Sequence, residues 1–173
     1  MARVVLQPSA NHAARQHYVD TIQAPVHLHT HRDLLSAADA AQLERAFPGG
    51  LAAMWGVTPG VADVNARKYS KASVGDLVLF AAHGAIFGSG VIAVKFRNRD
   101  LASQLWGFDQ KGQTWEYMYA LDEIRSLDIP YVEFNRVVGY EPNNVIQGFT
   151  VMNEERSRAF LDFYGFWSER HDP

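Results

Sequence analysis

The chain has 173 residues, of which 47% are hydrophobic and 20% are charged, and its formal net charge is −3. This size and composition exclude a disordered chain and predict a single domain over residues 1–173. Because the sequence contains no cysteine, disulfide bonds, thiolate metal sites and cysteine nucleophiles are excluded. The net charge argues against binding nucleic acid through bulk electrostatics, but it leaves room for a local basic surface.

Neither a membrane span nor a signal peptide is predicted. No apolar run approaches the length that crosses a bilayer, and the amino-terminal sequence MARVVLQPSANH lacks the apolar stretch of a signal peptide. The absence of cysteine also suits a reducing compartment. We therefore expect a cytoplasmic protein with no membrane partner.

The first predicted elements are a strand and a helix. Alternating β-formers predict a strand over Arg3–Gln7, which ends at Pro8. Ser9 or Asn11 can cap the helix that follows, which is predicted to run to about Thr21.

A second strand and a second helix are predicted next. The strand covers Ala24–His31, and Ser36 caps the helical segment AADAAQLERAF, which Pro48-Gly49-Gly50 stops. The sequence AMWGVTPG at positions 53–60 contains a Pro-Gly breaker and is predicted to be a turn that carries Trp55.

The middle of the chain predicts a sheet. The apolar run Asp76–Ala82 is typical of a buried strand, and His83-Gly84 turns the chain into a strand over Ile86–Phe96, whose glycines indicate a bulge. The remaining predicted elements are a helical turn at 101–105, a strand at 115–121, an edge segment at 129–134 and a helix at 154–164. This order predicts an α+β fold with a curved mixed sheet or open β-barrel flanked by helices.

Several aromatic side chains lie beside glycines at the ends of predicted elements. They are Trp55, Trp106, Phe108 and Trp115. Most tryptophans belong to a core, and that explanation stays open here. Glycine lets a flat ligand approach closely, so Trp55 and Trp106 are also candidates for two walls that stack on a planar or methylated ligand.

Acid–base and metal chemistry have little support. On a strand, His27, His29 and His31 would share one face and could hold zinc, although histidines at strand ends are often solvated. No phosphate-binding loop and no nucleophile motif is present. We therefore expect no catalytic residue, no metal and no cofactor.

Basic residues cluster next to the two unusual tryptophans. The clusters, which are either solvated surface or phosphate contacts, are Arg67, Lys68 and Lys71 after Trp55, and Lys95, Arg97 and Arg99 before Trp106. In the segment 142–149, Asn144 is either a turn residue or a reader of a base edge.

The order of these segments resembles the YTH and EVE domains of the PUA-like superfamily. It also resembles the reader domains at the N-terminus of modification-dependent restriction enzymes of the McrB and EVE–HNH types. The segments that carry the resemblance, which spans Arg3 to about Met152, are ARVVLQPSANH, AMWGVTPG, GDLVLFAAHGAIFGSGVIAV, LWGFDQKGQTWEYMYALDEI and IPYVEFNRVVGYEPNNVIQGF.

The resemblance implies roles for individual residues. Trp55 and Trp106 would be the walls of an aromatic cage, with Phe108 or Trp115 as the third wall. The candidates for hydrogen bonds to the base edge are Ser9, Asn11, Thr58 and Asn144. The implied function is to bind double-stranded DNA by flipping a modified, methylated base into the cage, as the reader module of a restriction system with a fused or associated nuclease. The alternatives are a reader of methylated RNA and an ASCH-like hydrolase that acts on modified nucleosides.

Overall fold

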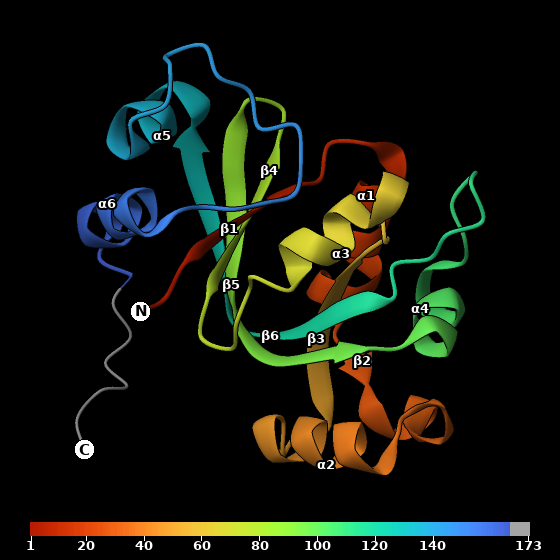
Figure 1. The fold of residues 1–173 in the computed structure, drawn as a ribbon. Helices are drawn as coiled ribbons and strands as arrows, with labels where there is room; N and C mark the ends of the chain where they lie inside the picture. The colour runs from red at the N-terminus through yellow and green to blue at the C-terminus, as the bar shows by residue number, and fades with distance from the viewer. Residues whose placement is uncertain (167–173) are drawn as a thin grey trace.

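The computed structural model describes residues 1–166, in which seven strands form one mixed sheet (Figure 1). The strands are β1 Val4–Pro8, β2 Val26–His27, β3 Leu51–Val57, β4 Leu77–Ala82, β5 Ala85–Arg97, β6 Tyr117–Pro130 and β7 Thr150–Val151. Their order across the sheet is β2-β3-β6-β5-β4-β1-β7. β1 pairs in parallel with β4, and the other pairs are antiparallel.

Helices lie around this sheet. The α-helices are α1 His12–Tyr18, α2 Ala37–Ala46, α3 Val64–Tyr69, α4 Arg99–Trp106, α5 Tyr131–Val138 and α6 Glu154–Tyr164. A π-helical segment η1, Val19–Gln23, continues α1, and 3-10 segments form η2, Leu28–Leu34, and η3, Val61–Asp63. No helix of residues 1–166 is both long enough and apolar enough to span a bilayer.

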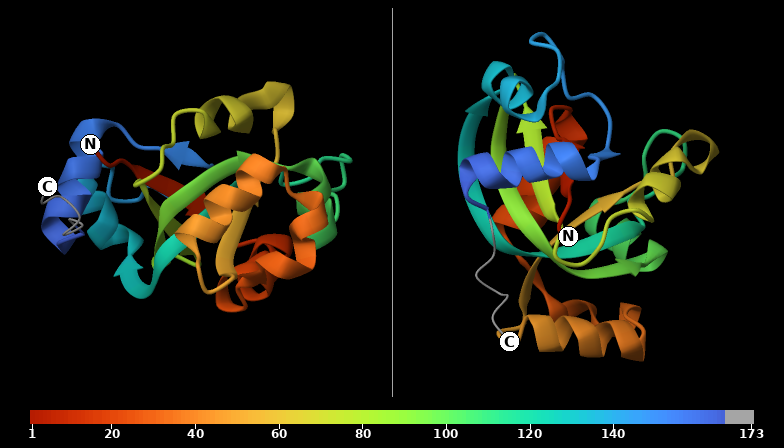
Figure 2. Two further views of the ribbon diagram at one scale, coloured as in Figure 1. Left: turned by 90° about the horizontal axis from the view of Figure 1, so that it is seen from below. Right: turned by 60° about the vertical axis from the view of Figure 1, so that its left-hand side comes forward.

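The sheet is open and strongly curved (Figure 2). The register between β5 and β6 shifts at three places along β5, between Ile86 and Gly88, Ser89 and Val91, and Ile92 and Val94. Bulges of this kind bend a strand and increase its twist. The α+β fold with a curved mixed sheet is therefore confirmed, and so is the bulge in the glycine-rich part of β5.

Three groups of buried side chains fill the space between the sheet and the helices. One lies under α5 and α6, and includes Phe134 and Phe160. A second lies under α1, η1 and α3, and a third lies under α2 and α4. β3 contributes to both of the latter, because Trp55 belongs to the second group and Met54 to the third. Both faces of β3 are thus covered.

Most predicted elements are confirmed to within a few residues. These are the first strand, the two helices of the amino-terminal part, both strands of the central hairpin, the helix before Trp106 and the last helix. The strand predicted at 115–121 is present as β6, but it continues to Pro130. Asn11 and Ser36 cap α1 and α2, accepting hydrogen bonds from the backbone N–H groups of Ala14 and Asp39.

Three predicted elements are wrong. Only Val26 and His27 of the predicted strand 24–31 are extended, because β3 begins at Leu51 and offers them only two partners. The predicted turn at 53–60 is instead β3 as far as Val57, since the apolar run LAAMWGV is buried on both faces. The predicted edge segment 129–134 is the end of β6 followed by α5, which begins directly after Pro130.

Candidate functional site

Trp55 lies on β3 at a place where one edge of the strand has no strand partner. β6 pairs with β3 along Ala53–Val57, but β2 reaches only Leu51 and Ala52 on the other edge. The segment η1 covers this edge, where the Thr21 hydroxyl donates a 2.7 Å hydrogen bond to the carbonyl of Met54. α1 and η1 therefore form the boundary of the sheet beside Trp55.

Four rings meet at this edge. The imidazole of His17, from α1, lies 4.4 Å from the ring centre of Trp115, 5.5 Å from that of Trp106 and 6.3 Å from that of Trp55. It is edge-on to Trp115 and Trp55, at 86° and 67°, and tilted by 33° to Trp106. We call these four residues the tryptophan cluster. Trp55 comes from β3, Trp106 and Trp115 come from the two ends of one loop, and His17 comes from α1.

Gly56 makes the close approach of these segments possible. A Cβ atom at this position would lie 2.1 Å from the carbonyl oxygen of Trp115 and 3.0 Å from Cζ3 of Trp106. No side chain fits at such distances, so the glycine is required by space rather than by its backbone angles. Trp55 and Gly56 are consecutive on a strand and point to opposite faces. The cluster consequently wraps around the strand edge.

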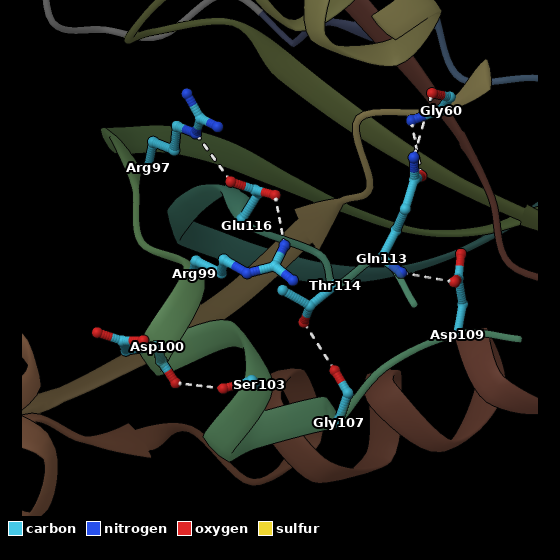
Figure 3. A network of polar contacts seen from close by, with 10 residues as sticks. All are labelled: Gly60, Arg97, Arg99, Asp100, Ser103, Gly107, Asp109, Gln113, Thr114 and Glu116. Atoms are coloured by element: carbon cyan, nitrogen blue, oxygen red, sulfur yellow. Dashed lines mark hydrogen bonds and ion pairs between the residues drawn. The ribbon is translucent and has the colours of Figure 1, made fainter. Parts of the chain in front are cut away.

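The loop between Trp106 and Trp115 is held in place by polar contacts (Figure 3). The Thr114 hydroxyl donates to the carbonyl of Gly107 at 2.7 Å, and Asp109 accepts from the backbone N–H groups of Lys111 and Gln113. The Gln113 amide bonds both backbone groups of Gly60, at 3.1 and 3.4 Å. The loop is thus tied to the turn that follows β3.

Two indole groups of the cluster lack hydrogen-bond partners. The Nε1 atoms of Trp55 and Trp106 are buried, and neither bonds to any of the described residues. Buried N–H groups are almost always paired, because leaving one unpaired costs roughly 1–3 kcal/mol. The two indole N–H groups are therefore buried donors without a partner in the described chain, and they call for an explanation.

His17 is neutral in this setting. Its side chain is buried, and burial lowers its pKa from 6.5 to about 4, although the charge of Asp20 acts in the opposite direction. An imidazolium surrounded by indoles and without a carboxylate in contact would be poorly solvated. The ring thus acts as a flat, uncharged heterocycle.

Arg97 and Arg99 lie next to the cluster and share one carboxylate. Glu116 is buried, and its two oxygens accept from Arg97 Nε at 2.9 Å and Arg99 Nη1 at 3.3 Å (Figure 3). Both arginine side chains are more than half exposed, and they pack over the rings of Tyr117 and Phe108. One carboxylate thus orients two exposed guanidinium groups and leaves a net positive charge beside Trp115.

The other predicted basic residues differ in exposure and in whether their charged groups already bond to the protein. Lys95 is occupied, because its ammonium donates to the carbonyls of Tyr69 and Ala72 at 2.9 and 2.5 Å. Arg67 and Lys71 are exposed on or beside α3, where Arg67 donates to the carbonyl of Ala62. On the same helix, Lys68 is half-buried.

The structure places the remaining predicted site residues outside the cluster. Phe108 is exposed and lies beside Arg99. Ser9 is buried and bonded to the carbonyl of Gln7, and Thr58 is half-buried just after β3. Asn11 is exposed and caps α1 with its side-chain oxygen.

Asn144 belongs to a loop that is fixed to α5. The side-chain N–H of Asn135 donates to the backbone carbonyl of Asn144 at 2.9 Å, and the N–H of Asn144 donates to the carbonyl of Glu141. These contacts account for a turn at this position, which is one of the two alternatives that the sequence leaves open.

A cavity of about 580 Å³ lies between α1 and the β4–β5 hairpin. Its lining residues are Ser9, His12, Arg15, Gln16, Tyr18, Val19, Ala82, His83, Ala85 and Phe87. His27, His29 and His31 do not gather elsewhere, because the strand that would align them is absent. In residues 1–166, no group of three or more histidine and carboxylate side chains is arranged to hold a metal ion.

His17 is the member of the cluster that sequence reasoning missed. Its signal was helical spacing: Ala14, His17, Tyr18 and Thr21 recur at intervals of three and four, and such a pattern indicates the buried side of a helix. A histidine on that side of α1 could therefore have been placed against β3.

The fold has a counterpart among solved structures. The chain matches the N-terminal domain of Thermococcus gammatolerans McrB bound to m5C DNA with a TM-score of 0.71 and 15% identity, over 95% of this chain and 98% of that one. The YTH domain of the Zygosaccharomyces rouxii MRB1 protein in complex with N6-methyladenosine RNA gives 0.49 and 12%, over 99% and 92%. No family model and no curated protein sequence matches the chain. The first match confirms the predicted resemblance in fold.

Proposed function

We propose that this domain binds nucleic acid that carries a methylated base, and that the tryptophan cluster receives the base. The observation that carries the proposal is the meeting of Trp55, Trp106 and Trp115 at one strand edge, with two indole N–H groups left unpaired. The fold shared with a McrB domain that was solved with m5C DNA supports it. Double-stranded DNA is the proposed substrate.

The energetics of base flipping are compatible with this site. Extruding a base from a duplex costs a few kcal/mol. Stacking on an aromatic side chain returns roughly 1–3 kcal/mol per contact, so two tryptophan walls are sufficient. Nucleobases also carry ring-nitrogen or carbonyl acceptors, which the indole N–H groups of Trp55 and Trp106 can satisfy. A methyl group on the base would add apolar contact with the indole rings.

The surface around the cluster suits a phosphate backbone. Arg97 and Arg99 are exposed and oriented by Glu116, and the loop beside them is joined to the start of the α3 region through Gln113 and Gly60. Arg67, Lys68 and Lys71 of the α3 region would extend this basic rim. Lys95 is not proposed as a phosphate contact, because two carbonyls hold its ammonium.

The domain would serve as the reader module of a modification-dependent restriction system, in which a fused or associated nuclease cuts the DNA. Methylated RNA is the second candidate ligand, since the same stacking contacts accept any base. The 2′-hydroxyl is the group that separates the two.

A binding panel with cluster variants tests the proposal. Trp106→Ala and Trp115→Ala are preferable to Trp55→Ala, because both side chains are only half-buried and their loss leaves the β3 core intact. We expect each variant to lose about 5- to 150-fold in affinity for a methylated duplex, as the loss of one stacking contact implies. Affinity is measured by fluorescence anisotropy with matched duplexes that are unmodified, or carry N6-methyladenine or 5-methylcytosine.

Tyr164→Ala is the matched control. Tyr164 is a half-buried aromatic on α6, bonded to Glu133, so its loss perturbs stability without touching the cluster. It should bind methylated duplex as the unaltered protein does. Equal binding of methylated and unmodified duplexes by the unaltered protein would refute the proposal, and stronger binding of methylated RNA of the same sequence would favour the second candidate.

A further inference from the structure

The imidazole ring of His17 already lies among the three indole rings of the tryptophan cluster. His17 contacts all three tryptophans, and its imidazole lies 4.4 Å from the ring centre of Trp115. A base stacked between two aromatic walls needs about 3.5 Å on each side. The space beside His17 is too narrow for a second ring, so a base and the imidazole cannot occupy the cluster together.

The imidazole fills this space without completing its hydrogen bonds. A neutral imidazole has one acceptor nitrogen, yet no hydrogen bond joins it to the indole N–H group of Trp55 or of Trp106. His17 forms no side-chain hydrogen bond with any residue of the described chain. It is therefore held by ring contacts alone, whereas an incoming base could add hydrogen bonds to the two donors.

The side chain of His17 is less firmly held than its backbone. α1 has only seven residues and buries His17 alone, while His12, Arg15 and Gln16 face solvent. Directly after Tyr18 the chain becomes the π-helical segment η1, a rare form that is frequent at functional sites. Thr21 fixes η1 to β3 through the carbonyl of Met54 and also bonds the backbone carbonyl of His17 at 2.9 Å, so the imidazole can leave by a change of rotamer while the backbone at position 17 stays in place.

We propose that His17 is an internal occupant of the base site, which has to leave before a base can enter. The proposal rests on the function proposed above and adds a residue that sets its affinity and selectivity. The apparent affinity is reduced by the small fraction of molecules in which His17 is displaced. Only a ligand that both stacks and satisfies the indole donors displaces the imidazole efficiently, which would discriminate against bases that merely stack.

Substitutions at position 17 test this directly. His17→Ala removes the ring, and we expect it to bind methylated duplex about 10- to 100-fold more tightly, as removal of a minor-state requirement predicts. His17→Phe keeps a ring that suits apolar walls better and should bind more weakly than the unaltered protein. The same two substitutions at His12, exposed on the same helix, are the controls and should change affinity little.

Free imidazole provides a second readout that needs no DNA. The His17→Ala protein should take up imidazole in the vacated space, with a change in tryptophan fluorescence that the unaltered protein and His12→Ala do not show. Added imidazole should also weaken DNA binding by the His17→Ala protein toward the level of the unaltered one. If a folded His17→Ala protein binds methylated duplex no more tightly than the unaltered protein, or if His17→Phe binds equally well, the internal occupant is ruled out.

The outcomes separate this inference from the proposed function. If the unaltered protein prefers methylated duplex and no substitution at position 17 alters its affinity, the proposed function is supported and the role of His17 as an internal occupant is refuted. If the His17→Ala protein takes up imidazole but none of the proteins distinguishes methylated from unmodified nucleic acid, the occupied ring site stands and the proposed function fails.

Discussion

Two groups of aromatic side chains lie side by side in this protein, and they differ in whether their polar atoms have hydrogen-bond partners. Trp55 on β3 pairs in register with Tyr119 on β6, and Tyr119 stacks on Tyr69 of α3 with ring centres 6.3 Å apart. The Tyr119 hydroxyl donates to the side-chain oxygen of Gln7 at 3.0 Å, and the Tyr69 hydroxyl donates to the carbonyls of Phe96 and Met118. By contrast, Trp55 and Trp106 leave their N–H groups unpaired.

Burial does not explain the difference, because Tyr69, Tyr119 and Trp55 are all buried in the same core group. The tyrosine pair acts as structure: it fixes α3 to the sheet and meets its polar requirements inside the protein. The tryptophan cluster is packed but chemically incomplete. Unpaired buried donors are rare in native proteins and call for an explanation. The ligand site proposed above would explain them.

The largest effect that should distinguish the two groups comes from Gly56→Ala. The added Cβ would lie 2.1 Å from the carbonyl oxygen of Trp115, so the loop carrying Trp115 must move away from β3. Overpacking of this kind costs about 3 kcal/mol or more in the free energy of unfolding. We also expect loss of binding to methylated duplex.

Gly49→Ala is the control for this substitution. Nothing lies within 4 Å of a Cβ at Gly49, so the free energy of unfolding should change by less than about 1 kcal/mol. Stability is measured by urea denaturation, with near-UV circular dichroism as a probe of the tryptophans. A Gly56→Ala protein with unchanged stability and unchanged binding would show that Trp115 and Trp106 do not need the close approach to β3.

The architecture was predictable from the sequence, and the inside of the site was not. Strong local signals, such as the apolar run before His83-Gly84 and the Ser36 cap, predict elements that the structure confirms. AMWGVTPG misleads because its glycine suggests a turn, although the run LAAMWGV that it overlaps is strand-like. Gly56 is needed because the Trp115 carbonyl lies opposite it, and the sequence does not reveal that contact. That contact joins residues far apart in the chain.

The same reason explains which site residues could be foreseen. Trp55 and Trp106 stand out by their neighbours in the sequence, but the meeting of both with His17 depends on how α1 lies along an unpaired strand edge. Lys95 has the charge that a phosphate contact requires, and only the tertiary structure reveals that its ammonium donates to two backbone carbonyls. Local patterns thus identify candidates, and long-range contacts decide among them.

Acid pH should lower the free energy of unfolding through His17 in the tryptophan cluster, by less than Gly56→Ala does, and should leave the contribution of the tyrosine pair unchanged. Burial lowers the pKa of His17 to about 4 from 6.5, so between these values the unfolded chain binds a proton that the folded chain does not. His17 therefore lowers the free energy of unfolding as pH falls from 6.5 to 4, by up to about 2–3 kcal/mol. The tyrosine pair contributes nothing in this range, since burial raises the pKa of both hydroxyls.

A comparison of variants isolates the histidine from carboxylates that titrate in the same range. Urea denaturation at pH 7 and pH 4.5 should show a smaller loss of stability for His17→Phe than for the unaltered protein. His29→Gln, at an exposed position, should lose as much stability as the unaltered protein. Parallel losses in all three proteins would mean that His17 is solvated and accepts its proton without cost.

The smallest effect concerns single hydrogen-bonding groups, and it addresses the comparison most directly. Tyr69→Phe removes a hydroxyl that bonds two buried carbonyls, so it should lower the free energy of unfolding by about 1–2 kcal/mol. Replacing Trp55 with 3-benzothienylalanine exchanges the indole N–H for sulfur and keeps the ring shape. Because that N–H has no partner among the described residues, stability should stay unchanged or rise slightly.

The two substitutions should have the opposite order of effects on the affinity for methylated duplex. The Tyr69→Phe protein keeps the tryptophan cluster and should bind methylated duplex normally, whereas the benzothienyl protein loses a donor to the base and should bind about tenfold more weakly. Urea denaturation and fluorescence anisotropy on the same two proteins measure both quantities. A benzothienyl protein that is destabilised like Tyr69→Phe, yet binds normally, would mean that the Trp55 N–H serves the fold, and the distinction between a completed and an incomplete aromatic group would then rest on Trp106 alone.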